Sequence, residues 1–80
     1  MEKTQVIAEI NKIFIDVLED DDIVLTEMTT ANDIEDWDSL NHIQLVVSIE
    51  KHFKIKFTSK EIQSWANVGE MIDCILHKGV

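Results

Sequence analysis

The sequence predicts an all-α fold, a small antiparallel bundle of three main helices plus one short helix. Two long stretches repeat apolar residues at three- and four-residue steps, as a helix with one buried face requires. Two further stretches begin with helix-capping residues, and no stretch alternates apolar and polar residues over the length of a strand. Eighty residues, of which 45% are apolar, suffice for one hydrophobic core, so residues 1–80 are predicted to form a single domain.

The first main helix is predicted from a stripe of apolar residues near the N-terminus. They are Val6, Ile7, Ile10, Ile13, Phe14, Val17 and Leu18. The acidic run from Glu19 to Asp22 ends this pattern, and a connection of about twenty residues then leads to Asp38. Its apolar anchors are predicted to be Ile23, Leu25, Met28 and Ile34. Irregular segments of this length are uncommon inside small domains and are often functional.

The second main helix is predicted from about Ser39 to Phe53. Its inward-facing residues are predicted to be Leu40, Ile43, Val46, Val47, Ile49 and Phe53. Lys51 and His52 stand near its end, where positive charge stabilises the helix dipole. Residues 55–57 alternate like a strand but have no obvious pairing partner, so they are predicted to be an extended connector.

Capping residues mark the start of the last two helices. Thr58 and Glu61 have the spacing of a capping box, which predicts a short helix that ends near Trp65. Asn67 is the predicted cap of the final helix, which Gly79 is placed to end. The buried stripe of that helix is predicted to be Met71, Ile72, Ile75 and Leu76.

The chain is strongly acidic, with sixteen aspartates and glutamates against seven lysines and a net charge of -9. The acids concentrate between Glu19 and Asp38. Such a field repels the phosphates of nucleic acids and of anionic lipids, so neither is an expected partner. It attracts basic patches on other proteins, although acids of this kind also simply keep a small domain in solution.

Nothing in the sequence indicates export or insertion into a membrane. The N-terminus lacks the sections of a signal peptide, and no apolar run approaches the ~20 residues that span a bilayer. Cys74 has no disulfide partner in the chain and lies among apolar residues, so it is predicted to be a small buried hydrophobe. We expect a soluble, monomeric protein of the cytoplasm.

The role of Ser39 decides which class of function the chain has, and three roles are possible. A serine at the start of a helix is expected to be its N-cap, worth on the order of 1 kcal/mol. Serine hydrolysis is disfavoured, because His42 lies on the same helix and no glycine elbow surrounds the serine. The third possibility is an acceptor: a phosphate ester on Ser39 would lie at a helix N-terminus, where free backbone N–H groups favour an anion.

Three other features have simpler interpretations. Trp37 either stacks against a partner or a cofactor arm, or it pins the loop to the bundle. Trp65 closes the short third helix and is predicted to belong to the core. The acidic stretch from Asp20 to Asp38 lacks the ligand spacing and the glycine of an EF-hand loop, so no metal site is predicted.

Asp38-Ser39-Leu40, at the start of an amphipathic helix after a long acidic loop, resembles the attachment motif of the acyl carrier protein family. The resemblance covers nearly the whole chain, up to the final helix after Asn67-Val68. It implies a carrier, not an enzyme, in which Ser39 bears 4′-phosphopantetheine that a phosphopantetheinyl transferase supplies from coenzyme A. The thiol of this arm would hold an acyl or aminoacyl group as a thioester.

The resemblance also implies which proteins the chain meets. A ligase that loads the acyl or aminoacyl group, and acyltransferase or synthase enzymes that use it, would dock on the second helix and the preceding loop. The residues expected to contact these partners are Asp36, Trp37, Asp38, Leu40, Ile43, Gln44 and Val47.

The chain departs from the family pattern in its loop and its second helix. Asp36 stands where many members have glycine, and Trp37 replaces a smaller neighbour. The second helix has Glu50 as its single acid. Residues 36–40 are more similar to dedicated carriers of surface-polysaccharide or specialised-metabolite pathways than to carriers of general fatty-acid synthesis. The rival hypothesis is an acidic helical module that binds a basic protein and is never modified.

Overall fold

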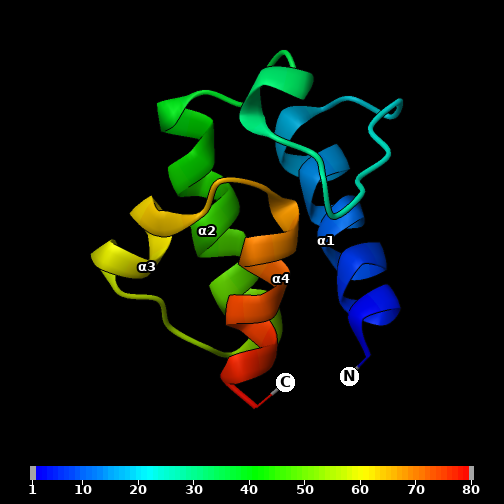
Figure 1. The fold of residues 1–80 in the computed structure, drawn as a ribbon. Helices are drawn as coiled ribbons and strands as arrows, with labels where there is room; N and C mark the ends of the chain where they lie inside the picture. Colours follow the sequence, from blue (N-terminus) through cyan, green and yellow to red (C-terminus); the bar gives the residue numbers. More distant parts are fainter. Residues whose placement is uncertain (1, 80) are drawn as a thin grey trace.

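The computed structural model describes residues 2–79, which form helices joined by loops (Figure 1). The elements are α1 (Lys3–Leu18), the short 3-10 helix η1 (Ala31–Asp33), α2 (Ser39–Phe53), α3 (Ser59–Ser64) and α4 (Val68–His77). No strand occurs among these described residues, and residues 55–57 form the predicted extended connector. The prediction of an all-α bundle with three main helices and one short helix is confirmed. No helix within residues 2–79 is long and apolar enough to cross a membrane.

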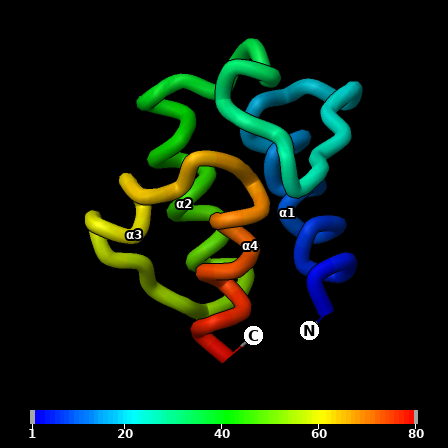
Figure 2. The backbone as a smooth tube through the Cα atoms, in the orientation of Figure 1, coloured from blue at the N-terminus to red at the C-terminus, as the bar shows by residue number. Residues whose placement is uncertain are grey.

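The bundle is built around α1, which packs against both α2 and α4. Figure 1 shows that α1 runs in the opposite direction to these two helices, so that its first turn and the last turn of α4 lie at the same end. The backbone tube in Figure 2 places α3 at the edge of the bundle, beyond α2 and α4. The long loop between α1 and α2 covers the opposite end from the chain termini.

The predicted helix caps of the C-terminal half are confirmed. The Thr58 hydroxyl accepts a hydrogen bond from the N–H of Glu61 at 3.1 Å, and the Glu61 carboxylate accepts one from the N–H of Thr58 at 2.8 Å. Asn67 Oδ1 accepts a hydrogen bond from the N–H of Glu70 at 2.9 Å. Gly79 follows α4 with a φ of 88°, a left-handed conformation that glycine adopts without strain.

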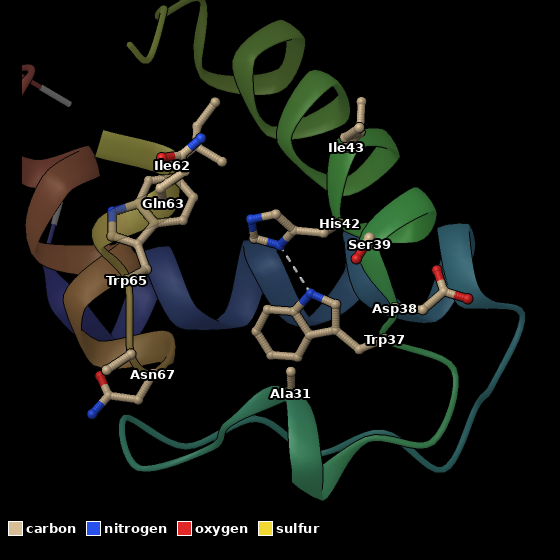
Figure 3. A pocket seen from close by; sticks show the side chains of 11 residues that line it. Ala31, Trp37, Asp38, Ser39, His42, Ile43, Ile62, Gln63, Trp65 and Asn67 are labelled. Carbon is tan, nitrogen blue, oxygen red and sulfur yellow. Dashed lines mark hydrogen bonds between the residues drawn. The ribbon is translucent and has the colours of Figure 1, made fainter. Parts of the chain in front are cut away.

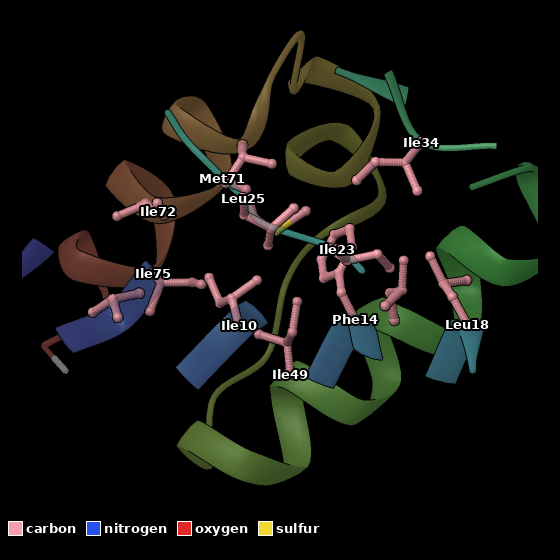
Figure 4. Packing of buried hydrophobic residues seen from close by; sticks show 13 residues of the cluster. Ile10, Phe14, Leu18, Ile23, Leu25, Ile34, Ile49, Met71, Ile72 and Ile75 are labelled. Carbon is pink, nitrogen blue, oxygen red and sulfur yellow. The ribbon is translucent and has the colours of Figure 1, made fainter. Parts of the chain in front are cut away.

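The hydrophobic core lies between α1, α2, α4 and the long loop (Figure 4). Its members are Val6, Ile10, Phe14, Leu18, Ile23, Leu25, Ile34, Leu45, Ile49, Val68, Met71, Ile72 and Ile75. Burying one such side chain contributes roughly 1.5–3 kcal/mol. No residue of α3 is fully buried, so this helix is attached to the bundle and is not part of its core.

The loop between α1 and α2 is anchored by Asn11 and not by apolar contacts alone. The Asn11 side-chain amide donates to the carbonyl of Ile23 at 3.1 Å and accepts from the N–H of Leu25 at 2.7 Å. Ile23, Leu25 and Ile34 are buried as predicted. The prediction that Met28 is an anchor is wrong, because Thr29 is buried at this turn and Met28 is 77% exposed.

A second attachment joins the loop to the start of α4. The N–H of Val68 donates to the carbonyl of Thr29, and the N–H of Gly69 donates to the carbonyl of Glu27, both at 2.9 Å. A Cβ atom at position 69 would lie 2.9 Å from that same Glu27 oxygen. The close approach therefore requires glycine, although glycine is a poor residue inside a helix.

The helix α2 carries two apolar stripes, and the structure buries only one of them. Leu45, Val46 and Ile49 face the core. The prediction that Leu40, Ile43 and Val47 also face inward is wrong: they are 67%, 61% and 41% exposed. Both stripes have helical spacing, and the packing of α2 against α1 and the rest of the core decides which one is covered.

Candidate functional site

Ser39 is the first residue of α2, and its side chain is exposed. The N-cap is Asp38, whose carboxylate accepts a hydrogen bond from the N–H of Asn41 at 2.8 Å. The structure therefore rules out the N-cap among the three possible roles of Ser39. Asp38 has the extended backbone that a cap requires, while Ser39 already has the helical conformation. The Ser39 hydroxyl is thus not needed for capping.

Hydrogen bonds to the backbone hold residues 36–38, which precede Ser39, in place. The side-chain amide of Asn41 donates to the carbonyl of Asp36 at 2.7 Å, and the N–H of Trp37 donates to the carbonyl of Ile34 at 3.2 Å. The carboxylates of Asp36 and Asp38 both lie at the surface. Ser39 therefore follows directly after a fixed turn, in which Asp36 and Asp38 place a negative charge on either side of Trp37.

A groove of about 650 Å³ opens beside Ser39, between α2 and α3 (Figure 3). Its lining residues are Ala31, Trp37, Asp38, Ser39, His42, Ile43, Ile62, Gln63, Trp65, Ala66 and Asn67. Three of these residues carry aromatic rings, which Figure 3 shows in the middle of the groove between Ser39 and α3. A group attached to Ser39 therefore has an adjacent surface of largely apolar side chains.

The aromatic rings form a continuous row from the core to α3. Phe14 meets Trp37 edge-on with ring centroids 4.9 Å apart. Trp37 stacks on His42 at 5.9 Å, and His42 meets Trp65 edge-on at 6.1 Å. Trp65 then packs edge-on against Phe57 at 4.9 Å. Aromatic pairs of this kind lower the free energy of the folded state by more than their buried area accounts for. The row therefore stabilises the attachment of the loop and of α3 to the bundle.

His42 accepts a hydrogen bond from Trp37 and is neutral in this arrangement. The indole Nε1 of Trp37 lies 3.0 Å from Nδ1 of His42. Because an indole nitrogen only donates, Nδ1 must be the unprotonated nitrogen, and the ring proton must be on Nε2. Burial lowers the pKa of His42 below its usual value of 6.5, opposed by a hydrogen bond with the backbone of Ile62. His42 therefore favours the neutral form that holds Trp37.

These contacts decide between the two roles of Trp37 and correct the prediction that Trp65 belongs to the core. Trp37 pins the loop to the bundle through Phe14 and His42, and it also lines the groove. Trp65 packs against the core but is only half-buried, so it belongs to the groove as well.

The helix α3 is held by a polar cluster as well as by aromatic rings. Glu61 pairs with Lys78 at 3.1 Å, and the Cys74 thiol donates to Glu61 at 3.4 Å. The hydrogen bond from the N–H of Thr58, followed by that from Lys78, lowers the pKa of Glu61 to about 2. Burial raises the pKa of Cys74, so its thiol stays protonated and unreactive, although Cys74 is half-buried and not part of the core.

Sequence reasoning missed several groove residues. The sequence indicates no groove role for His42, yet its ring lines the groove and its Nδ1 atom accepts the hydrogen bond from Trp37. Ile62, Gln63 and Asn67 line the groove from the α3 side, and nothing in their local sequence indicates it. For His42 the sequence does contain an indication that it faces inward: it lies one turn before Leu45, on the inward stripe of α2.

The predicted partner-contact residues fall into two groups in the structure. Leu40, Ile43, Gln44 and Val47 form an exposed surface on α2, which we call the outward face. Asp36, Asp38 and Trp37 belong to the turn before Ser39, where both aspartates are exposed and Trp37 is half-buried. The outward face and this turn meet at Ser39, so one partner surface can contact both.

The geometry around Ser39 fits a phosphodiester-linked arm. The hydroxyl is exposed, and the N–H groups of Ser39 and Leu40 have no carbonyl partner inside the helix because they belong to its first turn. These groups and the helix dipole favour a phosphate. The carboxylate of Asp38 opposes that charge, while the groove offers an apolar surface to the rest of the arm.

Comparison with known proteins agrees with this geometry. Residues 4–75 match the family model described as a phosphopantetheine attachment site. The chain is also similar to the holo acyl carrier protein from Geobacter metallireducens, a solution NMR structure, with 49% sequence identity and a TM-score of 0.85. The match covers 90% of this chain and 83% of that chain. The chain therefore belongs to the acyl carrier protein family, whose members are carriers and not catalysts, and its covalent cofactor is 4′-phosphopantetheine.

Proposed function

We propose that Ser39 is the attachment residue for 4′-phosphopantetheine and that the protein presents acyl or aminoacyl thioesters to partner enzymes in a dedicated biosynthetic pathway. One observation carries the proposal: Ser39 is an exposed hydroxyl at the start of α2 that is not used as its cap. The protein would act as a monomer in the cytoplasm. The specificity of the loading ligase would determine which acyl or aminoacyl group the arm carries.

The attachment step requires only an accessible nucleophile from this chain. The Ser39 oxygen forms a bond to the phosphorus that coenzyme A supplies, and the bond from that phosphorus to the nucleotide half breaks. The transferase takes the serine proton, so the carrier needs no base of its own. His42 is three residues away, but its Nδ1 atom is engaged by Trp37.

Partner enzymes are proposed to dock on the outward face of α2 and on the turn before it. Leu40 and Ile43 present exposed apolar side chains, and Asp36 and Asp38 lie beside them at the N-terminal end. A complementary partner has an apolar patch bordered by lysines or arginines on the side that reaches Ser39. The phosphopantetheinyl transferase, the loading ligase and the acyltransferase or synthase would share this surface in turn.

The proposal of a dedicated pathway rests on the charge of α2. Glu50 is the only acid of this helix, and its carboxylate is engaged, because it accepts the N–H of Phe57 at 2.7 Å. Enzymes that recognise a row of acids on α2 find none on its outward face, where Gln44 stands between apolar residues. The general enzymes of fatty-acid synthesis are therefore expected to use this carrier poorly.

The attachment residue is tested by intact-mass analysis after incubation with coenzyme A and a broad-specificity phosphopantetheinyl transferase. Wild type should gain the mass of one phosphopantetheine, and Ser39→Ala should gain none. Because Asp38 is the cap, Ser39→Ala should change the free energy of unfolding by less than about 0.5 kcal/mol. A folded wild type that stays unmodified, while a control carrier is modified, would support the unmodified interaction module instead.

The pathway is tested separately with the modified protein. A malonyl transferase of general fatty-acid synthesis should load it with a kcat/KM at least roughly tenfold below that for its own carrier, as the loss of charge contacts worth about 1.4 kcal/mol implies. Equal kcat/KM values would contradict the dedicated pathway and leave the attachment at Ser39 intact.

A further inference from the structure

We propose that the docking surface on α2 carries opposite charges at its two ends, so that it fits partner enzymes with a basic patch near Ser39 and an acidic patch at the far end of the helix. Lys51 and Lys54 are then specificity-determining residues, because they attract such partners and repel partners that are basic throughout. The inference rests on the proposed function, since it concerns enzymes that meet an arm on Ser39. It adds the chemistry of the partner's surface, which attachment alone leaves open.

The charges of the chain are separated between the two ends of α2. Residues 19–38, which precede the helix, contain nine acids and no lysine. Residues 51–60, which we call the basic segment, contain four lysines and no acid. Figure 1 places the loop before α2 at one end of the bundle and the last turn of α2 at the other end, near the chain termini. A partner that docks along α2 therefore meets opposite charges at its two ends.

The lysines of the basic segment differ from the others in having no ion-pair partner. All four are exposed, and within residues 2–79 none of them forms an ion pair with a carboxylate. The remaining lysines each pair with a carboxylate at 2.8–3.8 Å; they are Lys3, Lys12 and Lys78. The positive charges of the basic segment are therefore available to a partner.

The two acids that flank the basic segment are held by other groups. The Glu50 carboxylate accepts the N–H of Phe57 at 2.7 Å. Glu61 pairs with Lys78, beyond the last turn of α4, at 3.1 Å. Neither carboxylate is directed to a lysine of the segment.

The outward face of α2 ends in a lysine. Ile43, Val47 and Lys51 are separated by four residues each, so their side chains follow one stripe. Lys54 follows at the C-cap of the helix. A partner that covers the exposed apolar side chains therefore reaches Ser39 at one end and the amino group of Lys51 at the other.

The two charged ends are too far apart to cancel each other. Asp38 and Lys51 are thirteen residues apart, which corresponds to roughly 20 Å along a helix axis. The Debye length at physiological ionic strength is about 8 Å. Each end therefore acts on a partner separately, and the lysines attract carboxylates although the net charge of the chain is -9.

The arrangement fits a protein surface better than a membrane. Ile43 and Val47 are 61% and 41% exposed between the charged ends, and an apolar centre with a polar rim is typical of protein–protein interfaces. A surface of anionic lipid is negative throughout, so Asp36 and Asp38 beside Ser39 repel it. A protein with a uniformly basic patch is repelled by the lysines in the same way.

Charge reversal at Lys51 tests the inference as a gain of function. The probe is a malonyl transferase of general fatty-acid synthesis, acting on the phosphopantetheine form. Lys51→Glu should raise its kcat/KM by roughly three- to tenfold at low ionic strength, mainly by lowering KM, because a repulsive contact becomes attractive. Salt at about 0.5 M should remove most of the gain. A merely structural role of Lys51 at the end of the helix would not raise a reaction rate.

Lys12→Glu is the matched control for Lys51→Glu. It makes the same change of charge at an exposed residue, but on α1, which packs against the inward side of α2. Its kcat/KM should remain that of wild type. An equal gain in Lys12→Glu, or no gain in Lys51→Glu, would overturn the inference.

Lys54→Glu should give a gain in the same direction. Lys54 has a left-handed backbone with a φ of 59°, and Glu19 has the same conformation at the end of α1 with a φ of 53°. Glutamate therefore adds no new backbone strain at position 54. A loss of rate in this variant, with the fold intact by circular dichroism, would contradict the repulsive role of Lys54.

A peptide of six glutamates is the probe for the acidic patch of the partner. In NMR titrations at low ionic strength it should shift the backbone amide signals of Lys51 and Lys54 more than those of Asp36 and Asp38, and Lys51→Glu should abolish the shifts. Absence of these shifts in wild type would overturn the inference. Binding of wild type to phosphatidylglycerol vesicles that is lost in Lys51→Glu would assign the lysines to a membrane and would overturn it as well.

The proposed function and this inference fail in different ways. A wild type that gains no mass with coenzyme A and the phosphopantetheinyl transferase would overturn the attachment and this inference together. A wild type that is malonylated as fast as the enzyme's own carrier would overturn the dedicated pathway and the repulsion. A modified wild type that is malonylated slowly, together with an equally slow Lys51→Glu, would overturn this inference alone.

Discussion

The two apolar faces of α2 differ in what covers them. The inward face, with Leu45 and Ile49, is fully buried against the other main helices. The outward face, with Leu40 and Ile43, is more than 60% exposed at both residues. The residue types are the same, so hydrophobicity alone does not distinguish a residue that stabilises the fold from one that is available to a partner.

This difference separates stability from function along a single helix. Changes on the inward face are expected to lower the free energy of unfolding, whereas changes on the outward face should lower reaction rates with partner enzymes. Ser39 lies where both faces begin, and His42 connects the inward face to the groove. The following predictions test this separation.

The largest expected effect on stability is at Phe14. Its side chain is fully buried, and its ring supports Trp37. Phe14→Ala should lower the free energy of unfolding by about 3–5 kcal/mol, a large part of the roughly 4–12 kcal/mol expected for 80 residues. Urea denaturation followed by circular dichroism measures it. Phe14→Leu, which leaves a smaller cavity, should lose less, and equal losses in both variants would contradict the packing of the ring.

Gly69 should show the next largest effect, because it holds the loop that carries Trp37 and Asp38. Alanine at a helical position usually stabilises relative to glycine. Here its Cβ atom would lie 2.9 Å from the Glu27 carbonyl oxygen, so Gly69→Ala should destabilise by roughly 1–3 kcal/mol. Thermal unfolding measures the change, and a higher Tm in the variant would disprove the close approach.

A smaller effect is expected from the protonation of His42. Burial lowers its pKa in the folded protein, so below the usual value of 6.5 the unfolded chain binds more protons than the folded one. The contribution of His42 is therefore complete above pH 6.5 and is lost as the pH falls through the lowered pKa. Protonation of Nδ1 also removes the acceptor of the Trp37 hydrogen bond.

Denaturation of wild type and His42→Gln across this pH range checks the prediction. The groups that face the imidazole ring are the indoles of Trp37 and Trp65 and the backbone of Ile62, with Asp38 as the acid lining the same groove. The stability of wild type should fall more steeply below pH 6.5 than that of the variant. Parallel curves would show that His42 does not couple to folding.

The smallest effect on stability is expected on the outward face. Ile43→Ser replaces an exposed side chain, so the free energy of unfolding should change by less than about 0.5 kcal/mol. The kcat/KM of the phosphopantetheinyl transferase for this variant should nevertheless fall. Ile49→Ser, on the inward face, provides the contrasting case, because it places a hydroxyl in the core and should lower the free energy of unfolding. An unaltered kcat/KM for Ile43→Ser would remove Ile43 from the docking surface.

The candidate site could be predicted from the sequence only in part. Ser39 is the proposed attachment residue because of its tripeptide and its place at the start of a helix, both of which are local features. The three aromatic rings that line the groove could not be predicted to lie together, because Trp37, His42 and Trp65 come from a loop, from α2 and from the residue that follows α3. Their proximity depends on how these segments pack.

The sequence by itself determined the helices, the caps at Thr58 and Asn67, and the position of Ser39, because helical periodicity and capping act over a few neighbouring residues. Only the tertiary structure decided that Asp38 caps α2 and that Leu40 and Ile43 remain exposed. The physical reason is that two apolar stripes on one helix have equal local preference for burial. The packing of α2 against α1 and the core covers one stripe and leaves the other in contact with water.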